Sequence, residues 1–240
     1  SVDDQKVRDA ARMMSEKLHA YGWEYINIDD GWEAPERTKG GEILSNDKFP
    51  DFKALTDYIH GLGLKFGIYS SPGATTCGGH AGSYQHEEID ARTWERWGVD
   101  YLKYDYCGYL DIEKDSKEET IQEPYIVMRN ALDKVKRDIV FCVGYGAPNV
   151  WNWAAEAGGN QWRTTRDITD EWNVVTAIGT FQDVCADATA PGRNNDPDML
   201  VVGKLGQGWG SKVHDSYLTA DEQYSHISLW CILSAPLLIG

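Results

Sequence analysis

Two aspartates, Asp105 in YLKYDYC and Asp167 in WRTTRDITD, each directly follow a short β-like run. Parallel strands bring such carboxylates to one rim of a barrel or sheet, which is the face where these folds carry out chemistry. Two carboxylates on one rim are typical of glycoside hydrolysis, in which one attacks and the other transfers a proton. An aspartate after a strand is also a common helix N-cap. Position alone therefore leaves both interpretations of Asp105 open.

Further charged side chains lie close to Asp105 on the same predicted rim. Lys103 is two residues before Asp105 and so points to the same side of the strand. Its ammonium favours the ionised carboxylate that a nucleophile needs and can donate to a substrate hydroxyl, although a purely structural ion pair has the same sequence. Asp29 and Asp30 in INIDDGW repel one another, so we expect hydrogen-bond donors around them, and sugar hydroxyls are suitable donors. DDG is equally an ordinary turn sequence.

The second half of the chain carries the other candidates. A general acid needs a carboxyl that stays protonated near neutral pH, and a nearby negative charge such as Asp105 favours that state. Asp167 lies flush with a strand end and is the catalytic candidate, with Arg163 beside it, whereas Asp170 is the expected cap of the next helix. In NNDPDML, Asp198 is either a substrate contact or part of a rigid turn that Pro197 fixes.

Composition excludes several classes of protein. The chain has 240 residues and a formal charge of -15, which disfavours nucleic acid because a binder must offset backbone phosphates with Lys and Arg. No apolar run approaches the length of a membrane helix. The cysteines and histidines show no metal-binding spacing, so we expect neither a metal nor another cofactor. The 10 Trp and 13 Tyr weakly favour a sugar as the partner.

The predicted elements form a serial βα chain. Strands are predicted at 25–29, 65–70, 100–104, 139–143, 161–165, 198–202 and 236–239. Helices are predicted at 3–20, 50–61, 88–97, 122–137, 148–157, 170–179 and 220–234. This alternation predicts an α/β fold, and a (β/α)8 TIM barrel is favoured over an open doubly wound sheet, because acidic residues follow several strands and no GxGxxG follows the first. The chain starts on a helix, which predicts a segment of a longer protein.

The ordered set of motifs INIDDGW, FGIYSSPGATTCGG, WGVDYLKYDYC, WRTTRDITD, NDPDMLVVG and SAPLLIG resembles the family 27 glycoside hydrolases, the α-galactosidase or melibiase group. The resemblance covers nearly the whole chain. It implies a single catalytic barrel across residues 1–240 that lacks the first strand and the last helix, with a C-terminal β-sandwich in the parent protein. The implied activity is hydrolysis of terminal α-galactosides with retention of configuration.

The resemblance also implies a role for individual residues. Asp105 matches the nucleophile and Asp167 the acid/base. Asp29 and Asp30 match the pair that holds the O4 and O6 hydroxyls of galactose. The further matches are Lys103 and Arg163 as hydroxyl ligands, Tyr69 and Asp198 as pocket residues, and Cys77 with Cys107 as a disulfide. Such a disulfide predicts a secreted, periplasmic or lysosome-like location.

One position departs from the family. The family's CEW motif at the end of the fifth strand, whose Glu binds the sugar 2-hydroxyl, is replaced by Cys142, Val143 and Gly144. Tyr145 is the candidate replacement for that contact. The alternatives to an α-galactosidase are therefore relatives acting on α-N-acetylgalactosaminides, α-glucans or β-L-arabinopyranosides, and a non-catalytic carbohydrate-binding barrel. The sequence does not indicate an oligomeric state.

Overall fold

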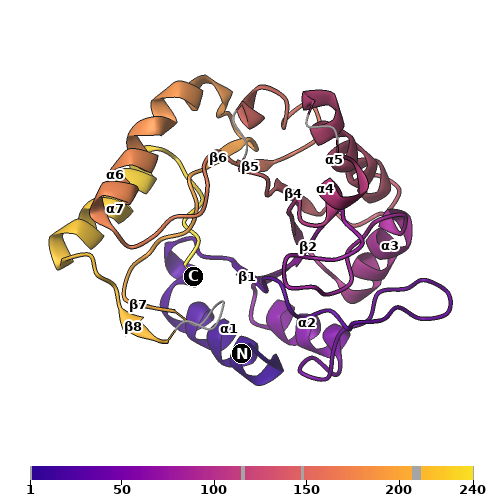
Figure 1. Ribbon diagram of the computed structural model, residues 1–240. Coiled ribbons are helices and arrows are strands. Elements are labelled where there is room, and N and C mark those ends of the chain that lie inside the picture. Colours follow the sequence, from indigo (N-terminus) through magenta and orange to yellow (C-terminus); the bar gives the residue numbers. More distant parts are fainter. Residues whose placement is uncertain (1, 115–116, 147–148, 207–211, 240) are drawn as a thin grey trace. The chain divides into compact units, whose positions relative to one another are not determined.

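The computed structural model describes residues 2–114, 117–146, 149–206 and 212–239 (Figure 1). The chain folds into two compact units. The N-terminal unit comprises Val2–Gly144 with Ala157–Gly159, and the C-terminal unit comprises Tyr145–Glu156 with Asn160–Gly240. Each unit contains parallel strands connected through helical segments. The chain is thus an α/β protein built from βα repeats, as the sequence predicts.

Within its described residues, the N-terminal unit has one run of four parallel strands. These are β1 (Tyr25–Asn27), β2 (Lys65–Ser70), β3 (Tyr101–Tyr104) and β4 (Val140–Val143), and each pairs with the next. All residues of β2 from Phe66 to Ser70 are buried, which is expected for a parallel strand covered on both faces. Tyr69 lies opposite Lys103, and Lys103 lies opposite Cys142. Because the strands are parallel, their carboxyl ends meet at one edge.

Helices alternate with these strands. They are α1 (Asp4–Lys17), α2 (Phe52–Gly61), α3 (Glu87–Trp97), the short α4 (Tyr109–Ile112) and α5 (Glu118–Leu132), with a 3-10 turn η1 (His19–Tyr21) after α1. Helix α2 begins after Asp51, whose side chain accepts a hydrogen bond from the amide of Ala54. Its stripe of Phe52, Leu55 and Ile59 is buried, which confirms the predicted helical period.

The C-terminal unit is smaller. It contains η2 (Val150–Asn152), β5 (Gln161–Arg163), α6 (Trp172–Phe181), η3 (Gln182–Ala188), β6 (Asn194–Asp196), the antiparallel pair β7 (Lys204–Leu205) and β8 (His214–Asp215), and α7 (Ala220–Ile232). Strands β5 and β6 are parallel. A capping box formed by Thr219 and Glu222 starts α7. The buried apolar cluster of this unit contains Val175, Ile178, Leu200, Leu218 and Trp230.

The predicted strand at 198–202 is wrong. The strand that pairs with β5 lies earlier in the chain, at β6. Leu200, inside the predicted strand, makes only an isolated bridge with Ile239. An apolar pattern does not reveal β6, because its side chains are polar and are buried through hydrogen bonds. Asn195 accepts from the Trp162 indole at 2.6 Å, and Asp196 accepts from the Gln161 amide at 2.7 Å. In consequence Asp196 ends a strand instead of preceding one.

The predicted helix at 148–157 is also wrong. Within its described residues only η2 has a helical turn, and 153–158 form turns. Asn149, just before η2, has a φ of 67°, a left-handed conformation that does not continue into an α-helix. The helix predicted at 122–137 exists but spans Glu118–Leu132. None of the described helices is long and apolar enough to cross a bilayer.

Candidate active site

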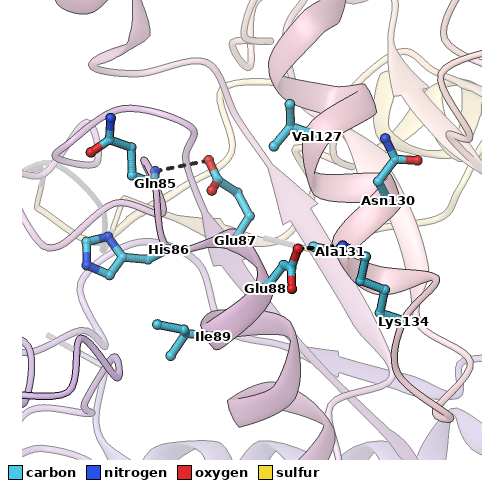
Figure 2. A pocket seen from close by; sticks show the side chains of 9 residues that line it. All are labelled: Gln85, His86, Glu87, Glu88, Ile89, Val127, Asn130, Ala131 and Lys134. Atoms are coloured by element: carbon cyan, nitrogen blue, oxygen red, sulfur yellow. Dashed lines mark hydrogen bonds and ion pairs between the residues drawn. The ribbon is translucent and has the colours of Figure 1, made fainter.

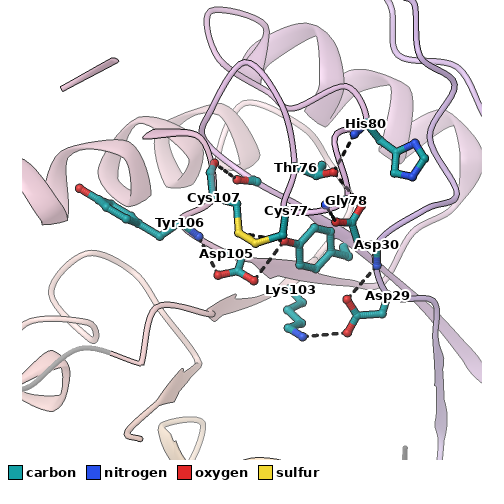
Figure 3. Close-up of a disulfide and its surroundings, with 12 residues drawn as sticks. Asp29, Asp30, Thr76, Cys77, Gly78, His80, Lys103, Asp105, Tyr106 and Cys107 are labelled. Atoms are coloured by element: carbon teal, nitrogen blue, oxygen red, sulfur yellow. Dashed lines mark hydrogen bonds and ion pairs between the residues drawn. A yellow bond between two sulfur atoms is a disulfide. The ribbon is translucent and has the colours of Figure 1, made fainter. Parts of the chain in front are cut away.

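Strands β1, β2 and β3 place four of the predicted site residues at one edge of the N-terminal unit (Figure 3). Tyr69 and Lys103 face one another across neighbouring strands. Asp105 directly follows the last residue of β3, and Asp29 comes two residues after the end of β1. The carboxyl ends of parallel strands therefore gather these side chains, as the sequence predicts.

The carboxylate of Asp105 accepts hydrogen bonds from two protein groups. The Tyr69 hydroxyl donates at 3.0 Å, and the Tyr106 amide donates at 2.8 Å. Burial raises the pKa of Asp105, while the Lys103 charge and these two donors lower it. Helix α4 has Gly108 as its N-cap and no capping side chain. Asp105 is therefore not the N-cap of the helix that follows it.

Lys103 forms an ion pair with Asp29. Its Nζ donates to Asp29 Oδ2 at 2.8 Å, and the ammonium lies 5.4 Å from the centroid of the Tyr69 ring. The Lys103 side chain is 25% exposed and that of Asp29 is 55% exposed. Lys103 is thus part of an ion pair with Asp29, and its charge also lowers the pKa of Asp105. Its contact with a substrate hydroxyl stays a prediction.

Asp30 is held by the loop after β2. Its two carboxylate oxygens accept from the Thr76 hydroxyl at 2.7 Å and from the Gly78 amide at 2.6 Å. The Asp30 amide in turn donates to Asp29 Oδ1 at 2.8 Å (Figure 3). The expected donors around this pair therefore include protein groups. These contacts fix the direction in which the two adjacent carboxylates point.

Cys77 and Cys107 form a disulfide between the loop after β2 and the end of β3 (Figure 3). Their Sγ atoms and a carboxylate oxygen of Asp105 all lie within 4.8 Å of one another. The Tyr69 hydroxyl also lies 3.8 Å from the Cys107 sulfur. Because both sulfurs are bonded to each other, they do not offer the thiolates that a metal site needs. The disulfide ties the loop that holds Asp30 to the strand end that carries Asp105.

Glu33, four residues after Asp29, is a buried carboxyl that no sequence motif marks. Its side chain is fully buried, and its Oε2 accepts from the Gly31 amide at 3.1 Å. Burial raises the pKa of Glu33 from 4.5 to about 8, and the charge of Asp30 contributes to the increase. Its Oε1 has no hydrogen-bond partner among the described residues. A glutamate after DDGW has no local signal that would distinguish it from a surface residue.

The C-terminal unit holds Arg163 and Asp167. Arg163 is the last residue of β5, and its Nη2 donates to Asp167 Oδ1 at 3.1 Å. The Arg163 side chain is 7% exposed, whereas that of Asp167 is 93% exposed. Helix α6 begins after Glu171 without a capping side chain. The prediction that Asp170 caps this helix is therefore wrong, and Asp170 instead accepts from the Tyr217 amide at 2.8 Å.

Asp198 is buried and lies just beyond β6. Its Oδ2 accepts from the Ile168 amide at 2.9 Å and forms an ion pair with Arg163 Nη2 at 2.9 Å. Its Oδ1 accepts from the Met199 amide at 2.8 Å. Asp198 thus contacts the loop of Asp167, and its carboxylate already faces protein donors.

Val143 is the last residue of β4, and Tyr145 comes two residues later. Val143, at the position where the family resemblance implies a sugar-binding glutamate, is fully buried. Tyr145 lies two residues beyond β4 and is partly exposed. Its predicted contact with the sugar stays a prediction.

A separate hollow of about 350 Å³ lies between α3 and α5 on the N-terminal unit (Figure 2). None of the predicted site residues lines it. Its walls are formed by Gln85, His86, Glu87, Glu88, Ile89, Val127, Asn130, Ala131 and Lys134. Two of these residues, Lys134 and Glu88, form an ion pair with each other, so their charges offset one another (Figure 2). The predicted site residues lie elsewhere, and those from Asp29 to Asp105 gather at the strand ends.

Comparison with known proteins matches these motifs to one family. The family described as alpha galactosidase A matches residues 2–240. An alpha-galactosidase of Cyamopsis tetragonoloba is 42% identical, over 100% of this chain and 55% of the relative. This chain belongs to the alpha-galactosidase A family. The chain spans about half the length of the curated relatives it matches.

Solved members of the alpha-galactosidase A family have the same fold as this chain. The alpha-galactosidase I of Mortierella vinacea superposes with a TM-score of 0.89 at 34% identity, covering 100% of this chain and 63% of the other. A β-L-arabinopyranosidase of Geobacillus stearothermophilus superposes with a TM-score of 0.82 at 25% identity, covering 100% of this chain and 68% of the other. Within the family the same framework thus accompanies different sugar specificities.

Proposed function

We propose that this protein is a retaining exo-glycosidase that removes terminal α-D-galactosyl residues from oligosaccharides or glycoconjugates. The observation that carries the proposal is the environment of Asp105. A strand-end carboxylate that accepts from the Tyr69 hydroxyl and lies near the Lys103 charge is suited to nucleophilic attack, because both groups favour its ionised form. The identity to enzymes named alpha-galactosidase supports the same substrate.

In the proposed mechanism Asp105 attacks the anomeric carbon while Asp167 gives its proton to the leaving oxygen. The glycosidic bond breaks as a glycosyl ester forms on Asp105. Asp167 then takes a proton from water, whose oxygen attacks the anomeric carbon and releases the sugar with Asp105 as a free carboxylate. Retention requires the two carboxyl groups to lie about 5–5.5 Å apart on either side of the bound sugar.

The remaining predicted residues, apart from Asp198, bind the sugar in this proposal. Asp29 and Asp30 hold the O4 and O6 hydroxyls, and Lys103 and Arg163 bind further hydroxyls. The Nε of Arg163 is buried and has no partner among the described residues, which supports a donor role toward a ligand. Tyr69 lines the pocket, and Tyr145 replaces the contact to the 2-hydroxyl. No cofactor or metal takes part.

We further propose a single catalytic barrel across residues 1–240, with the first strand and the last helix of a (β/α)8 barrel outside this range and a β-sandwich after it. The greater length of the relatives supports this arrangement. The disulfide supports a secreted, periplasmic or lysosome-like location. The charge of -15 disfavours nucleic acid as a partner, and no membrane partner is proposed.

An assay of the full-length protein on aryl glycosides tests the proposal. We expect turnover of the α-galactoside, little turnover of the α-N-acetylgalactosaminide, α-glucoside or β-L-arabinopyranoside, and a loss of at least about 10³-fold in Asp105→Asn. Proton NMR of the first-formed sugar should show the α-anomer. Asp57→Asn is the control, because Asp57 is an exposed helix residue paired with Lys53. Preference for another sugar would favour the corresponding relative, and binding without turnover would favour a carbohydrate-binding barrel.

A further inference from the structure

We propose that Asp198 is a positioning residue for the acid/base Asp167 and not a ligand of the sugar. The inference rests on the proposed function, because it concerns how the proton donor of that reaction is held. It starts from the contacts of the Asp198 carboxylate. Oδ1 accepts from the Met199 amide, and Oδ2 accepts from the Ile168 amide and forms an ion pair with Arg163.

These protein contacts involve both oxygens of the Asp198 carboxylate. A carboxylate has about four acceptor positions; two are already used by amide donors at 2.8 and 2.9 Å, and the Arg163 guanidinium lies 2.9 Å from Oδ2. The side chain is only 6% exposed. A sugar hydroxyl would have to compete with a buried guanidinium for this group. The geometry therefore favours an internal role.

The backbone of Asp198 is held as firmly as its side chain. Its φ is 81°, in the left-handed region that a non-glycine residue adopts only when surrounding contacts enforce it. The Asp198 amide donates to Asp196 Oδ1 at 2.8 Å, and its carbonyl accepts from the Trp230 indole at 2.8 Å. Strand β6 and helix α7 thus fix this residue from two sides.

The hydrogen bond from the Ile168 amide connects Asp198 to the backbone next to Asp167. Ile168 is the residue directly after Asp167, so its amide belongs to the peptide bond that Asp167 contributes. The Asp167 side chain is itself almost fully exposed. Its direction is therefore set by its backbone and by the bond from Arg163. Asp198 contacts both the backbone after Asp167, through the Ile168 amide, and Arg163.

Arg163 is the second connection between Asp198 and Asp167. Its Nη2 is shared between Asp198 at 2.9 Å and Asp167 at 3.1 Å. The pair with Asp198 is buried on both sides, whereas Asp167 is exposed, so the guanidinium charge is offset mainly by Asp198. Without Asp198, Arg163 loses its buried carboxylate partner, and the guanidinium that contacts Asp167 is held less firmly. The Asp167 carboxyl is then less well placed to give its proton to the leaving oxygen.

The test compares leaving groups in the full-length enzyme. A poor leaving group needs protonation, whereas a dinitrophenyl group departs without it, so only the first depends on the acid. We expect Asp198→Asn to lower kcat/KM by at least about tenfold on an alkyl α-galactoside and by less than about threefold on the dinitrophenyl α-galactoside. The ratio within one preparation does not depend on the folded fraction. Asp215→Asn, an exposed partner of Lys204, should change neither value more than about twofold.

Two further variants complete the test. Trp230→Phe removes the donor to the Asp198 carbonyl and should show the same leaving-group dependence to a smaller degree. Equal losses on both substrates, or a raised KM with unchanged kcat on both, would overturn the positioning role. Asp167→Asn should show the strongest dependence. Its failure to do so would overturn the proposed acid/base itself, which is a distinct result.

Discussion

The Tyr69 hydroxyl donates a hydrogen bond to Oδ2 of Asp105 at 3.0 Å. Tyr69 lies on β2 and Asp105 follows β3, so the bond joins the ends of neighbouring parallel strands. A phenol that donates to a carboxylate stabilises the charged form. Burial by contrast raises the pKa of Asp105. The bond is therefore part of what keeps a buried nucleophile ionised.

Tyr69→Phe should move the acidic limb of the pH profile of kcat/KM to higher pH. The Tyr69 hydrogen bond lowers the pKa of Asp105, so its removal raises that pKa, and more of the nucleophile is protonated at low pH. We expect a loss of about tenfold near pH 5, as for one hydrogen bond to a charged group. Initial rates on an aryl α-galactoside between pH 4 and 8 measure the effect (roughly the range in which a perturbed carboxyl titrates). Tyr21→Phe, at an exposed tyrosine, should leave the limb in place.

Loss of the Cys77–Cys107 disulfide should destabilise the protein. The bond closes a loop with a sequence separation of 30, for which the chain-entropy model predicts about 3–4 kcal/mol. Cys77→Ser with Cys107→Ser should therefore lower Tm by about 6–12 °C. Calorimetry with and without a reductant checks this, and reductant should not lower the Tm of the double variant further. Cys231→Ser, at an exposed free cysteine, is the matched control.

Glu33→Gln should stabilise the protein at alkaline pH. The pKa of Glu33 is raised from 4.5 in the unfolded chain to about 8 in the fold, so the folded state binds a proton more tightly. The corresponding stability is fully present below pH 4.5 and is lost as the pH rises through about 8. The neutral amide has no such dependence. We expect the Tm of the variant relative to wild type to rise from pH 5 to pH 9 by about 5 °C.

Melting curves across this pH range measure the Glu33 effect. Glu16→Gln, on the exposed face of α1, provides a control whose Tm difference should not change with pH. A constant difference in Glu33→Gln as well would contradict a raised pKa at Glu33.

The sequence by itself determined the βα order and most of the N-terminal candidates. Strand periodicity located β1 to β4 to within a residue or two, because buried parallel strands are apolar runs. Motif order gave the family, and the pairing of Cys77 with Cys107 followed from that resemblance. The sequence predicted a strand-end position for both Lys103 and Asp105, because Lys103 lies within such a run and Asp105 directly follows it.

Only the tertiary structure decided the partners of these side chains. Strand β6 was missed because its polar residues are buried through hydrogen bonds to residues about thirty positions earlier, which no local pattern records. Lys103 pairs with Asp29 across 74 positions, and Glu33 is buried by packing. Periodicity reports which face of an element is apolar, whereas hydrogen-bond partners and pKa values depend on groups that are distant in sequence and near in space.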